Sequence, residues 1–258
     1  MAEKITSKSN PKIKALLSLQ QKSGERRERS LFVVEGRREF EHCMEAGFTP
    51  EAVFICPELF PDARLPECSV FEVSREVYET IAYRGGTEGI VAEVKARPRT
   101  LESLQLGDSP LVAVIEGVEK PGNIGAILRS CDAAGVDALI VCDPRADIYN
   151  PNLIRASIGA AFTVPCVSCS SVEAISFLKS RGIRILTAQL QDSSLYYDCD
   201  MTRGTAIVMG TESTGLSTQW REAADAHIRI PMLGRLDSLN VSVSAAILLF
   251  EAVRQRNG

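Results

Sequence analysis

The sequence predicts an α/β protein in two parts, a small N-terminal α/β domain and a larger C-terminal domain with a mostly parallel sheet. Short β-branched apolar runs alternate with helical periodicity, and Gly, Pro or Asn ends many of the runs. With 45% hydrophobic content, 258 residues are enough to bury the cores of two ordinary domains. We predict the N-terminal domain over 1–97, a linker over 98–109, where prolines and polar residues interrupt the periodicity, and the C-terminal domain over 110–258.

The first elements follow from local signals. Asn10 and Pro11 predict the start of a helix over 10–21, since asparagine caps helix N-termini and proline suits the first helical position. Strand and helix then alternate, with a strand over 30–36, a helix over 37–47 that Gly47 ends, and a strand over 51–57. Glycines 85, 86 and 89 precede another strand and indicate either a tight turn or a close approach to a ligand.

The C-terminal domain opens with a βαβ unit. A buried strand over 111–118 leads through a loop to a helix over 126–135, which Gly135 ends before a strand over 137–143. The later pattern predicts a helix over 151–162, strands over 163–167, 184–190 and 205–210, and a helix over 170–182. The last helix, about 240–256, is apolar nearly all round, which is typical of a helix inside the core or at a subunit contact.

Charge is unevenly distributed along the chain. The net charge is −4, but the first 40 residues carry ten basic and five acidic side chains. Two interpretations stay open: these lysines and arginines form an ordinary solvated helix face, or they attract phosphate groups.

Composition excludes several classes of protein. We expect no membrane span, because no run of about 18 apolar residues occurs, and the start MAEKITSKSN lacks the apolar core of a secretory signal, so we predict a cytoplasmic protein. Packing accounts best for the eight cysteines. Only Cys166 and Cys169 form a C-x-x-C, and with two histidines in the chain we expect no metal site.

Standard nucleotide and hydrolase motifs are missing. The chain has no G-x-G-x-x-G turn, no G-x-x-x-x-G-K-[ST] loop and no G-x-S-x-G elbow. These absences argue against a nicotinamide dehydrogenase, a P-loop enzyme and a serine hydrolase.

Three polar segments each follow a short apolar run: KPGNIGAILRS at 120–130, IVMGTESTGLS at 207–217 and IPMLGRLDSLNVSVSAA at 230–246. Parallel strands place ligand sites beyond their carboxyl ends, so the three segments predict one site. Asn123 in the loop and Arg129 one to two turns into the helix are expected beside that crevice.

In order and spacing these segments resemble the three motifs of the SpoU, or TrmH-like, RNA ribose 2′-O-methyltransferases of the SPOUT superfamily. The resemblance implies S-adenosylmethionine as methyl donor, no metal, a homodimer, and a C-terminal trefoil knot that periodicity by itself does not reveal. It also implies a catalytic set of Arg129, Asn123, Glu212, Ser238 and Asn240. The cofactor positions that it implies are Gly210, Ile230 and Leu239, together with Met209 and Met232.

Physical chemistry narrows the role of Arg129. The family's usual proposal makes this arginine a general base, yet a guanidinium stays protonated in nearly all protein settings. We therefore favour electrostatic stabilisation, in which Arg129 holds an RNA phosphate and steadies the developing alkoxide. A structural salt bridge is the alternative for Arg129, turn formation for Asn123, and helix capping for Ser238 and Asn240.

The N-terminal domain is similar to the small ribosomal-protein-like domain with which many members hold RNA. Candidate RNA contacts are Lys12, Lys14, Arg26, Arg27, Arg37 and Arg84. Because such a domain commonly accompanies ribosomal substrates, we expect rRNA, 23S or other, rather than tRNA. The alternatives are a tRNA 2′-O-methyltransferase, a non-catalytic RNA-binding protein on the same scaffold, and the tRNA guanine-N1 branch, which the first motif disfavours.

Overall fold

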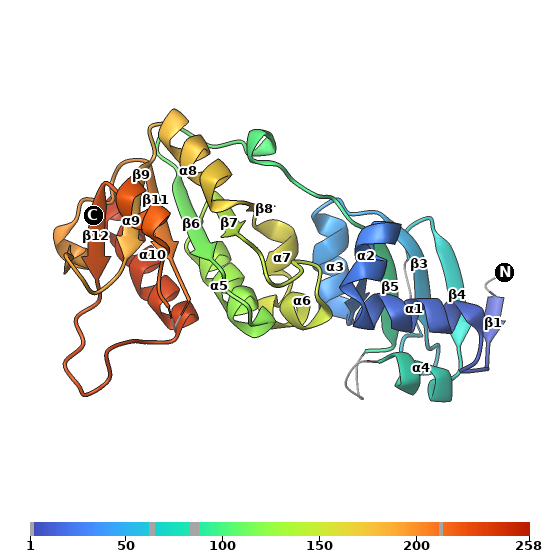
Figure 1. The fold of residues 1–258 in the computed structure, drawn as a ribbon. Coiled ribbons are helices and arrows are strands. Elements are labelled where there is room, and N and C mark those ends of the chain that lie inside the picture. The colour runs from blue at the N-terminus through green and yellow to red at the C-terminus, as the bar shows by residue number, and fades with distance from the viewer. Residues whose placement is uncertain (1–2, 62–64, 83–87, 212–213) are drawn as a thin grey trace. The chain divides into compact units, whose positions relative to one another are not determined.

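A computed structural model describes residues 3–61, 65–82, 88–211 and 214–258. Residue contacts divide the chain into two compact units, one of Met1–Arg97 with Asp147–Thr163, the other of Pro98–Ala146 with Val164–Gly258 (Figure 1). The first division falls where the sequence predicts the end of the N-terminal domain. The segment 147–163, which we predicted in the C-terminal domain, groups instead with the N-terminal unit. Within the described ranges, no helix is long and apolar enough to cross a membrane.

The N-terminal unit contains a mixed five-stranded sheet in the order β1-β4-β3-β5-β2. Strands β1, β4 and β3 pair in parallel, whereas β5 is antiparallel to both β3 and β2. The strands are β1 (Glu3–Ile5), β2 (Leu31–Glu35), β3 (Pro50–Ile55), β4 (Ser69–Val73) and β5 (Ile90–Lys95). The helices are α1 (Pro11–Gln21), α2 (Ser23–Arg29), α3 (Arg37–Glu45) and α4 (Arg75–Ile81).

Local signals in the N-terminal unit act as predicted. The Asn10 side chain accepts a hydrogen bond from the Lys12 N–H at 2.9 Å and caps α1, whose first residue is Pro11. Gly89 has φ +80°, and a Cβ there would lie 2.7 Å from the Cβ of Leu59. The close approach at Gly89 is therefore to the protein's own chain, as in a tight turn.

The segment 147–163 forms two short helices, α6 (Pro151–Ser157) and α7 (Ala160–Thr163), and not the single helix that we predicted. The helix is interrupted where Ile158 and Gly159 both adopt positive φ. Packing explains why this segment belongs to the N-terminal unit: Phe32 on β2 stacks on Tyr149 with ring centroids 4.4 Å apart and also contacts Phe162.

The C-terminal unit contains a seven-stranded sheet in the order β10-β12-β9-β11-β6-β7-β8, and all its pairs are parallel, which confirms the predicted sheet type. Its strands are β6 (Leu111–Glu116), β7 (Ala138–Cys142), β8 (Cys166–Cys169), β9 (Arg184–Ala188), β10 (Ser194–Leu195), β11 (Thr205–Met209) and β12 (Ala226–Arg229). Strands β6, β7 and β11 are buried throughout, as expected for a parallel sheet covered on both faces.

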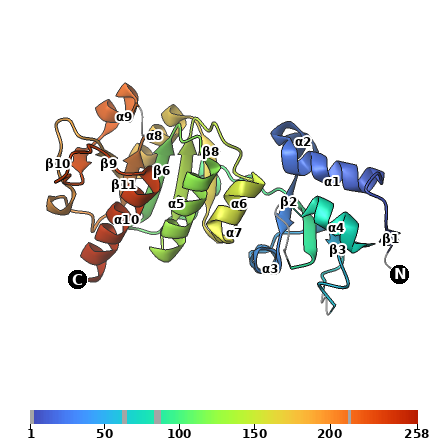
Figure 2. The ribbon, with the colours of Figure 1, turned by 90° about the horizontal axis from the view of Figure 1, so that it is seen from below.

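Helices cover both faces of this sheet. Figure 2 shows α5 (Pro121–Ala133) and α10 (Val241–Asn257) side by side on one face, with α8 (Ser171–Ser180) and α9 (Thr218–Ala223) on the opposite face. Single turns of 3₁₀ helix lie at Leu101–Ser103 and Tyr196–Asp198. Helix α5 begins at Pro121, five residues earlier than predicted, because proline occupies the first helical position and glycine does not prevent a first turn. Asn123 therefore lies in the first turn of α5 and not in a loop.

Candidate active site

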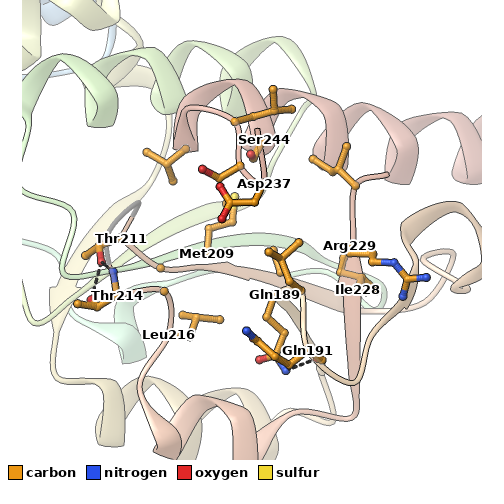
Figure 3. A pocket seen from close by; sticks show the side chains of 18 of the residues that line it. Gln189, Gln191, Met209, Thr211, Thr214, Leu216, Ile228, Arg229, Asp237 and Ser244 are labelled. Atoms are coloured by element: carbon orange, nitrogen blue, oxygen red, sulfur yellow. Dashed lines mark hydrogen bonds between the residues drawn. The ribbon is translucent and has the colours of Figure 1, made fainter. Parts of the chain in front are cut away.

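A cavity of about 340 Å³ opens beyond the carboxyl ends of β9, β11 and β12. The described residues that line it come from 188–191 at the end of β9, 209–211 and 214–216 after β11, 228–232 after β12, and 237–244, which leads into α10 (Figure 3). Arg221 on α9 lines it as well. Because neighbouring parallel strands end at the same edge of the sheet, residues far apart in the sequence meet here. The cavity lies where the second and third polar segments predict a site.

The loop after β11 folds back tightly on itself. The Gly215 N–H donates to the Thr211 carbonyl at 3.0 Å, and these two residues form an isolated antiparallel bridge. A Cβ on Gly210 would lie 2.3 Å from the carbonyl carbon and oxygen of Gly215 and 2.6 Å from the Leu216 nitrogen. Only glycine at 210 allows this approach, so the shape of this cavity wall depends on it.

All five residues predicted to contact the cofactor line this one cavity: Gly210, Ile230, Leu239, Met209 and Met232. Ser238, predicted in the catalytic set, lines it as well. Their contacts with a cofactor stay a prediction.

Asn240 connects the third segment to the first. Its Oδ1 accepts hydrogen bonds from the N–H of Ser242 at 3.0 Å and from the hydroxyl of the same residue at 2.6 Å, which caps α10. Its Nδ2 donates to Oδ1 of Asn123 on α5 at 3.3 Å. Asn240 is thus both the cap that we weighed as its alternative role and a link to Asn123.

Arg129 lies in the third turn of α5 with an exposed side chain. No hydrogen bond or ion pair engages its guanidinium among the described residues, so the salt bridge that we weighed for it is absent from that part of the chain. The cation is therefore available to a ligand. Glu212 lies outside the described residues, and its position beside Asn123 or Arg129 stays a prediction.

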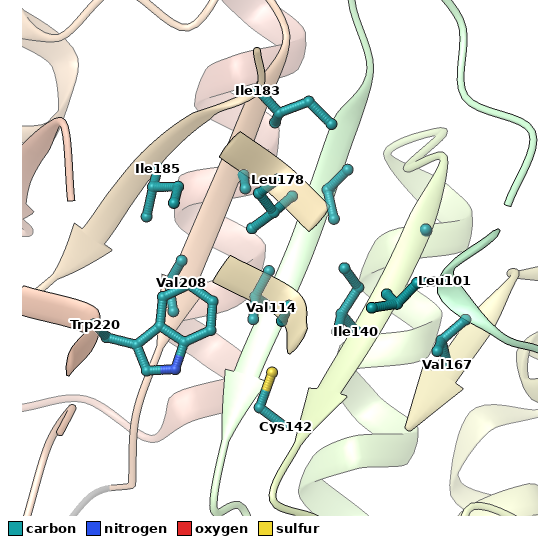
Figure 4. Close-up of a cluster of buried hydrophobic side chains, with 14 of the residues drawn as sticks. Leu101, Val114, Ile140, Cys142, Val167, Leu178, Ile183, Ile185, Val208 and Trp220 are labelled. Atoms are coloured by element: carbon teal, nitrogen blue, oxygen red, sulfur yellow. The ribbon is translucent and has the colours of Figure 1, made fainter. Parts of the chain in front are cut away.

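A buried polar network behind the site was not predicted. Glu116, only 9% exposed, ends the apolar strand β6 and accepts hydrogen bonds from the Ser217 N–H at 2.8 Å and the Ser171 hydroxyl at 3.2 Å. The Trp220 Nε1–H donates to the same hydroxyl at 2.9 Å, and its indole packs in the apolar cluster of Figure 4. Glu116 thereby holds the end of the loop that walls the cavity. The available signal was a carboxylate inside the run LVAVIEGV.

Arg26 must be removed from the predicted RNA contacts. Its side chain is 4% exposed, and its Nε donates to Asp147 Oδ2 at 2.6 Å. Its Nη1 donates to the Leu19 carbonyl at 2.5 Å. Arg26 is a buried structural residue that joins α2 to the segment 147–163, and no phosphate reaches it there.

The other predicted RNA contacts differ in availability. Lys14, Arg27 and Arg37 are exposed, Lys12 is half-buried and pairs with a neighbouring glutamate, and Arg84 lies outside the described residues. The three exposed cations stay candidates for phosphate binding.

The cysteines form no disulfide and are all free. A hydrogen bond with Cys142 on the neighbouring strand holds the pKa of Cys169 below its ordinary value. In the part of the chain that the structure describes, no group of three His, Cys, Asp or Glu side chains is arranged to hold a metal ion.

The fold and the cavity define an α/β protein with a ligand site at the carboxyl edge of a parallel sheet, lined by the second and third motif segments and connected to the first through Asn240 and Asn123. The chain belongs to the SpoU rRNA Methylase family, whose model matches residues 110–250. A second model, the MRM3-like substrate binding domain, matches residues 10–92.

Individual proteins agree with this assignment. The 23S rRNA (guanosine-2′-O-)-methyltransferase RlmB of Vibrio parahaemolyticus is 36% identical over 76% of this chain and 81% of its own length. A crystal structure of an RNA 2′-O ribose methyltransferase shares 37% identity and a TM-score of 0.87, covering 99% of this chain and 100% of that one. The AdoMet-bound rRNA methyltransferase from Sinorhizobium meliloti has 27% identity and a TM-score of 0.90, with 98% of both chains covered.

Proposed function

We propose that this protein transfers a methyl group from S-adenosylmethionine to a ribose 2′-hydroxyl of 23S rRNA, at a guanosine. One observation carries the proposal: the three motif segments meet at one edge of the sheet. The second and third line the same cavity, and Asn240 of the third bonds to Asn123 on the helix that carries Arg129. The names of the relatives supply the RNA and the nucleoside.

The cavity suits S-adenosylmethionine. Its volume is in the range of small-molecule sites, and its lining combines apolar side chains with Gly210 and Gly215 of the loop after β11, which carry no side chain to cover their main chain. Because Gly210 has no Cβ, its main chain can lie against the Gly215 carbonyl. When bound, this cofactor supplies an activated methyl group on a sulfonium centre.

The residues of the chain have to align the ribose hydroxyl and stabilise its developing negative charge. Asn123, held by Asn240, can orient the ribose through its amide. Arg129 carries a permanent positive charge, has no intramolecular partner among the described residues, and suits the incipient alkoxide or a neighbouring phosphate. We assign Ser238, on the cavity wall, and Glu212 to positioning of the hydroxyl and of Arg129.

We also propose a homodimer. Val243 and Phe250 on α10 are each 47% exposed, and their spacing of seven residues places them on the same face of the helix. Large apolar side chains in such a row are typical of a helix that a second subunit covers. A Phe250→Glu variant should sediment as a monomer, whereas a wild-type monomer at micromolar concentration would reject the dimer.

Two further expectations rest on the family. The trefoil knot of the C-terminal chain stays a prediction. A cytoplasmic location also stays a prediction. It is based on the expectation that an enzyme of ribosomal RNA acts where that RNA is available.

The activity is tested with the full-length protein, methyl-labelled S-adenosylmethionine, and separate 23S rRNA and tRNA fractions that lack the modification. After digestion to nucleosides, mass spectrometry should detect 2′-O-methylguanosine from the 23S fraction. A 2′-O-methyl product from tRNA alone would reject the ribosomal substrate, and N1-methylguanosine would reject the ribose reaction. Cofactor binding without a product in any RNA would favour the non-catalytic alternative.

A further inference from the structure

Asp237 is a carboxylate on the cavity wall with no partner of its own. It belongs to the segment between β12 and α10, its side chain is exposed, and no hydrogen bond or ion pair engages it among the described residues. Figure 3 shows it on the α10 side of the cavity, next to Ser244. Nothing in the described fold requires a negative charge at this position.

The charges around the cavity are few, and among the described residues neither lining arginine forms an ion pair with Asp237. Among its described lining residues, only Asp237, Arg221 and Arg229 are charged. Figure 3 places Arg229 away from Asp237, and its Nη1 donates to the Ser193 hydroxyl at 3.4 Å. The negative charge is therefore free to attract a cationic group of a ligand.

Asp237 also lies close in sequence to the residues that connect the cavity wall to α5. It is adjacent in sequence to Ser238 and three residues from Asn240, which bonds to Asn123 on α5. If a ribose binds at Asn123 and Arg129, we expect the group that reacts with it to lie on the side of the cavity that these residues approach. In S-adenosylmethionine that group is the sulfonium, which is positively charged.

We propose that Asp237 recognises the sulfonium charge of the methyl donor and makes the site prefer the donor over its demethylated by-product. The inference rests on the proposed function. Methyl transfer breaks a carbon–sulfur bond and forms a carbon–oxygen bond, the hydroxyl proton passes to solvent, and sulfur keeps the bonding electron pair as a neutral thioether. The charge that Asp237 attracts is present before transfer and absent after it.

This role predicts a particular kinetic signature. An attraction to the full sulfonium charge is strongest in the ground state and weakens as that charge disperses, so it aids binding more than the chemical step. In Asp237→Asn, the KM for the donor should rise while kcat stays within about twofold of the wild-type value. Inhibition by the by-product should become stronger relative to donor binding.

The direct test compares two ligands that differ by the methyl group and its charge. Calorimetric titration of the full-length protein gives the dissociation constants of S-adenosylmethionine and S-adenosylhomocysteine, and their ratio cancels any general damage to the site. For an exposed charge, Asp237→Asn should reduce the preference for the donor by roughly three- to tenfold at low salt, and by less as salt screens it. Asp237→Glu, which keeps the charge, should retain the preference.

Glu222→Gln is the matched control. Glu222 is an exposed acid on α9 that does not line the cavity and has no partner among the described residues. Its substitution therefore removes the same charge elsewhere in the unit. Its ratio should equal that of the wild type. If the ratio of the two dissociation constants is unchanged in Asp237→Asn, including the case in which both ligands bind more weakly by the same factor, the inference is overturned while the proposed function stays intact. If the wild type binds neither ligand, the proposed function fails, and this inference with it.

Discussion

Replacing Gly210 by alanine tests how the loop after β11 forms the cofactor cavity. The added Cβ would lie 2.3 Å from the carbonyl group of Gly215 and 2.6 Å from the Leu216 nitrogen. These are backbone atoms, which cannot rotate away as the end of a long side chain can. Because ordinary contacts of a Cβ begin near 3.4 Å, the loop has to move by about 1 Å.

Overpacking of this kind typically costs about 1–3 kcal/mol. If the loop moves to relieve the clash, the wall formed by Gly210, Gly215 and Leu216 no longer has its native shape. We therefore expect the dissociation constant of S-adenosylhomocysteine to rise at least about tenfold, which corresponds to about 1.4 kcal/mol. The free energy of unfolding should fall by no more than the overpacking cost.

Calorimetric titration measures the first quantity and denaturant unfolding the second. Gly234→Ala is the matched control, because Gly234 lies in the exposed segment before α10 and its Cβ would meet no atom within 4 Å. This control should bind as the wild type does. Wild-type affinity in Gly210→Ala would refute the reasoning, since the loop would then accept a Cβ without loss of the cavity.

Four further substitutions separate positioning, catalytic, structural and RNA-binding roles. Glu116→Ala removes the buried acceptor of the Ser217 N–H, so we expect about 1–3 kcal/mol less stability by denaturant unfolding and weaker cofactor binding; an unchanged cofactor affinity would contradict its positioning role. Arg129→Lys should lower kcat at least about tenfold in a methylation assay without changing the unfolding midpoint, and near-normal turnover would argue against a role that depends on guanidinium geometry. Arg26→Gln leaves the Asp147 carboxylate without its cation and should destabilise the N-terminal unit by about 2–4 kcal/mol in denaturant unfolding. Lys14→Gln should weaken RNA binding without changing stability. A loss of RNA affinity without a loss of stability in Arg26→Gln, or the reverse in Lys14→Gln, would contradict these roles.

The sequence predicted many of the individual helices and strands. Asn10 with Pro11, the glycine after α3 and the β-branched runs predicted helices and strands that the structure contains, because caps, positive φ and hydrophobic periodicity act over a few residues. The order of the three motif segments predicted a site at strand ends. Errors arose where local signals compete, as at Pro121, where glycines suggested a loop but proline begins a helix.

Tertiary contacts decided the rest. The charge of Arg26 predicts a surface cation, yet Asp147, distant in the sequence, and two main-chain carbonyls make burial favourable. Nothing local indicates that the segment 147–163 packs on the first sheet through Tyr149 and Phe162, or that Glu116 holds the Ser217 N–H of another strand's loop. Sequence by itself determined the elements and the chemical groups at their ends, since both are short-range properties. Only the folded chain determined which groups are buried, paired or free, because those properties depend on partners that the sequence separates by tens of residues.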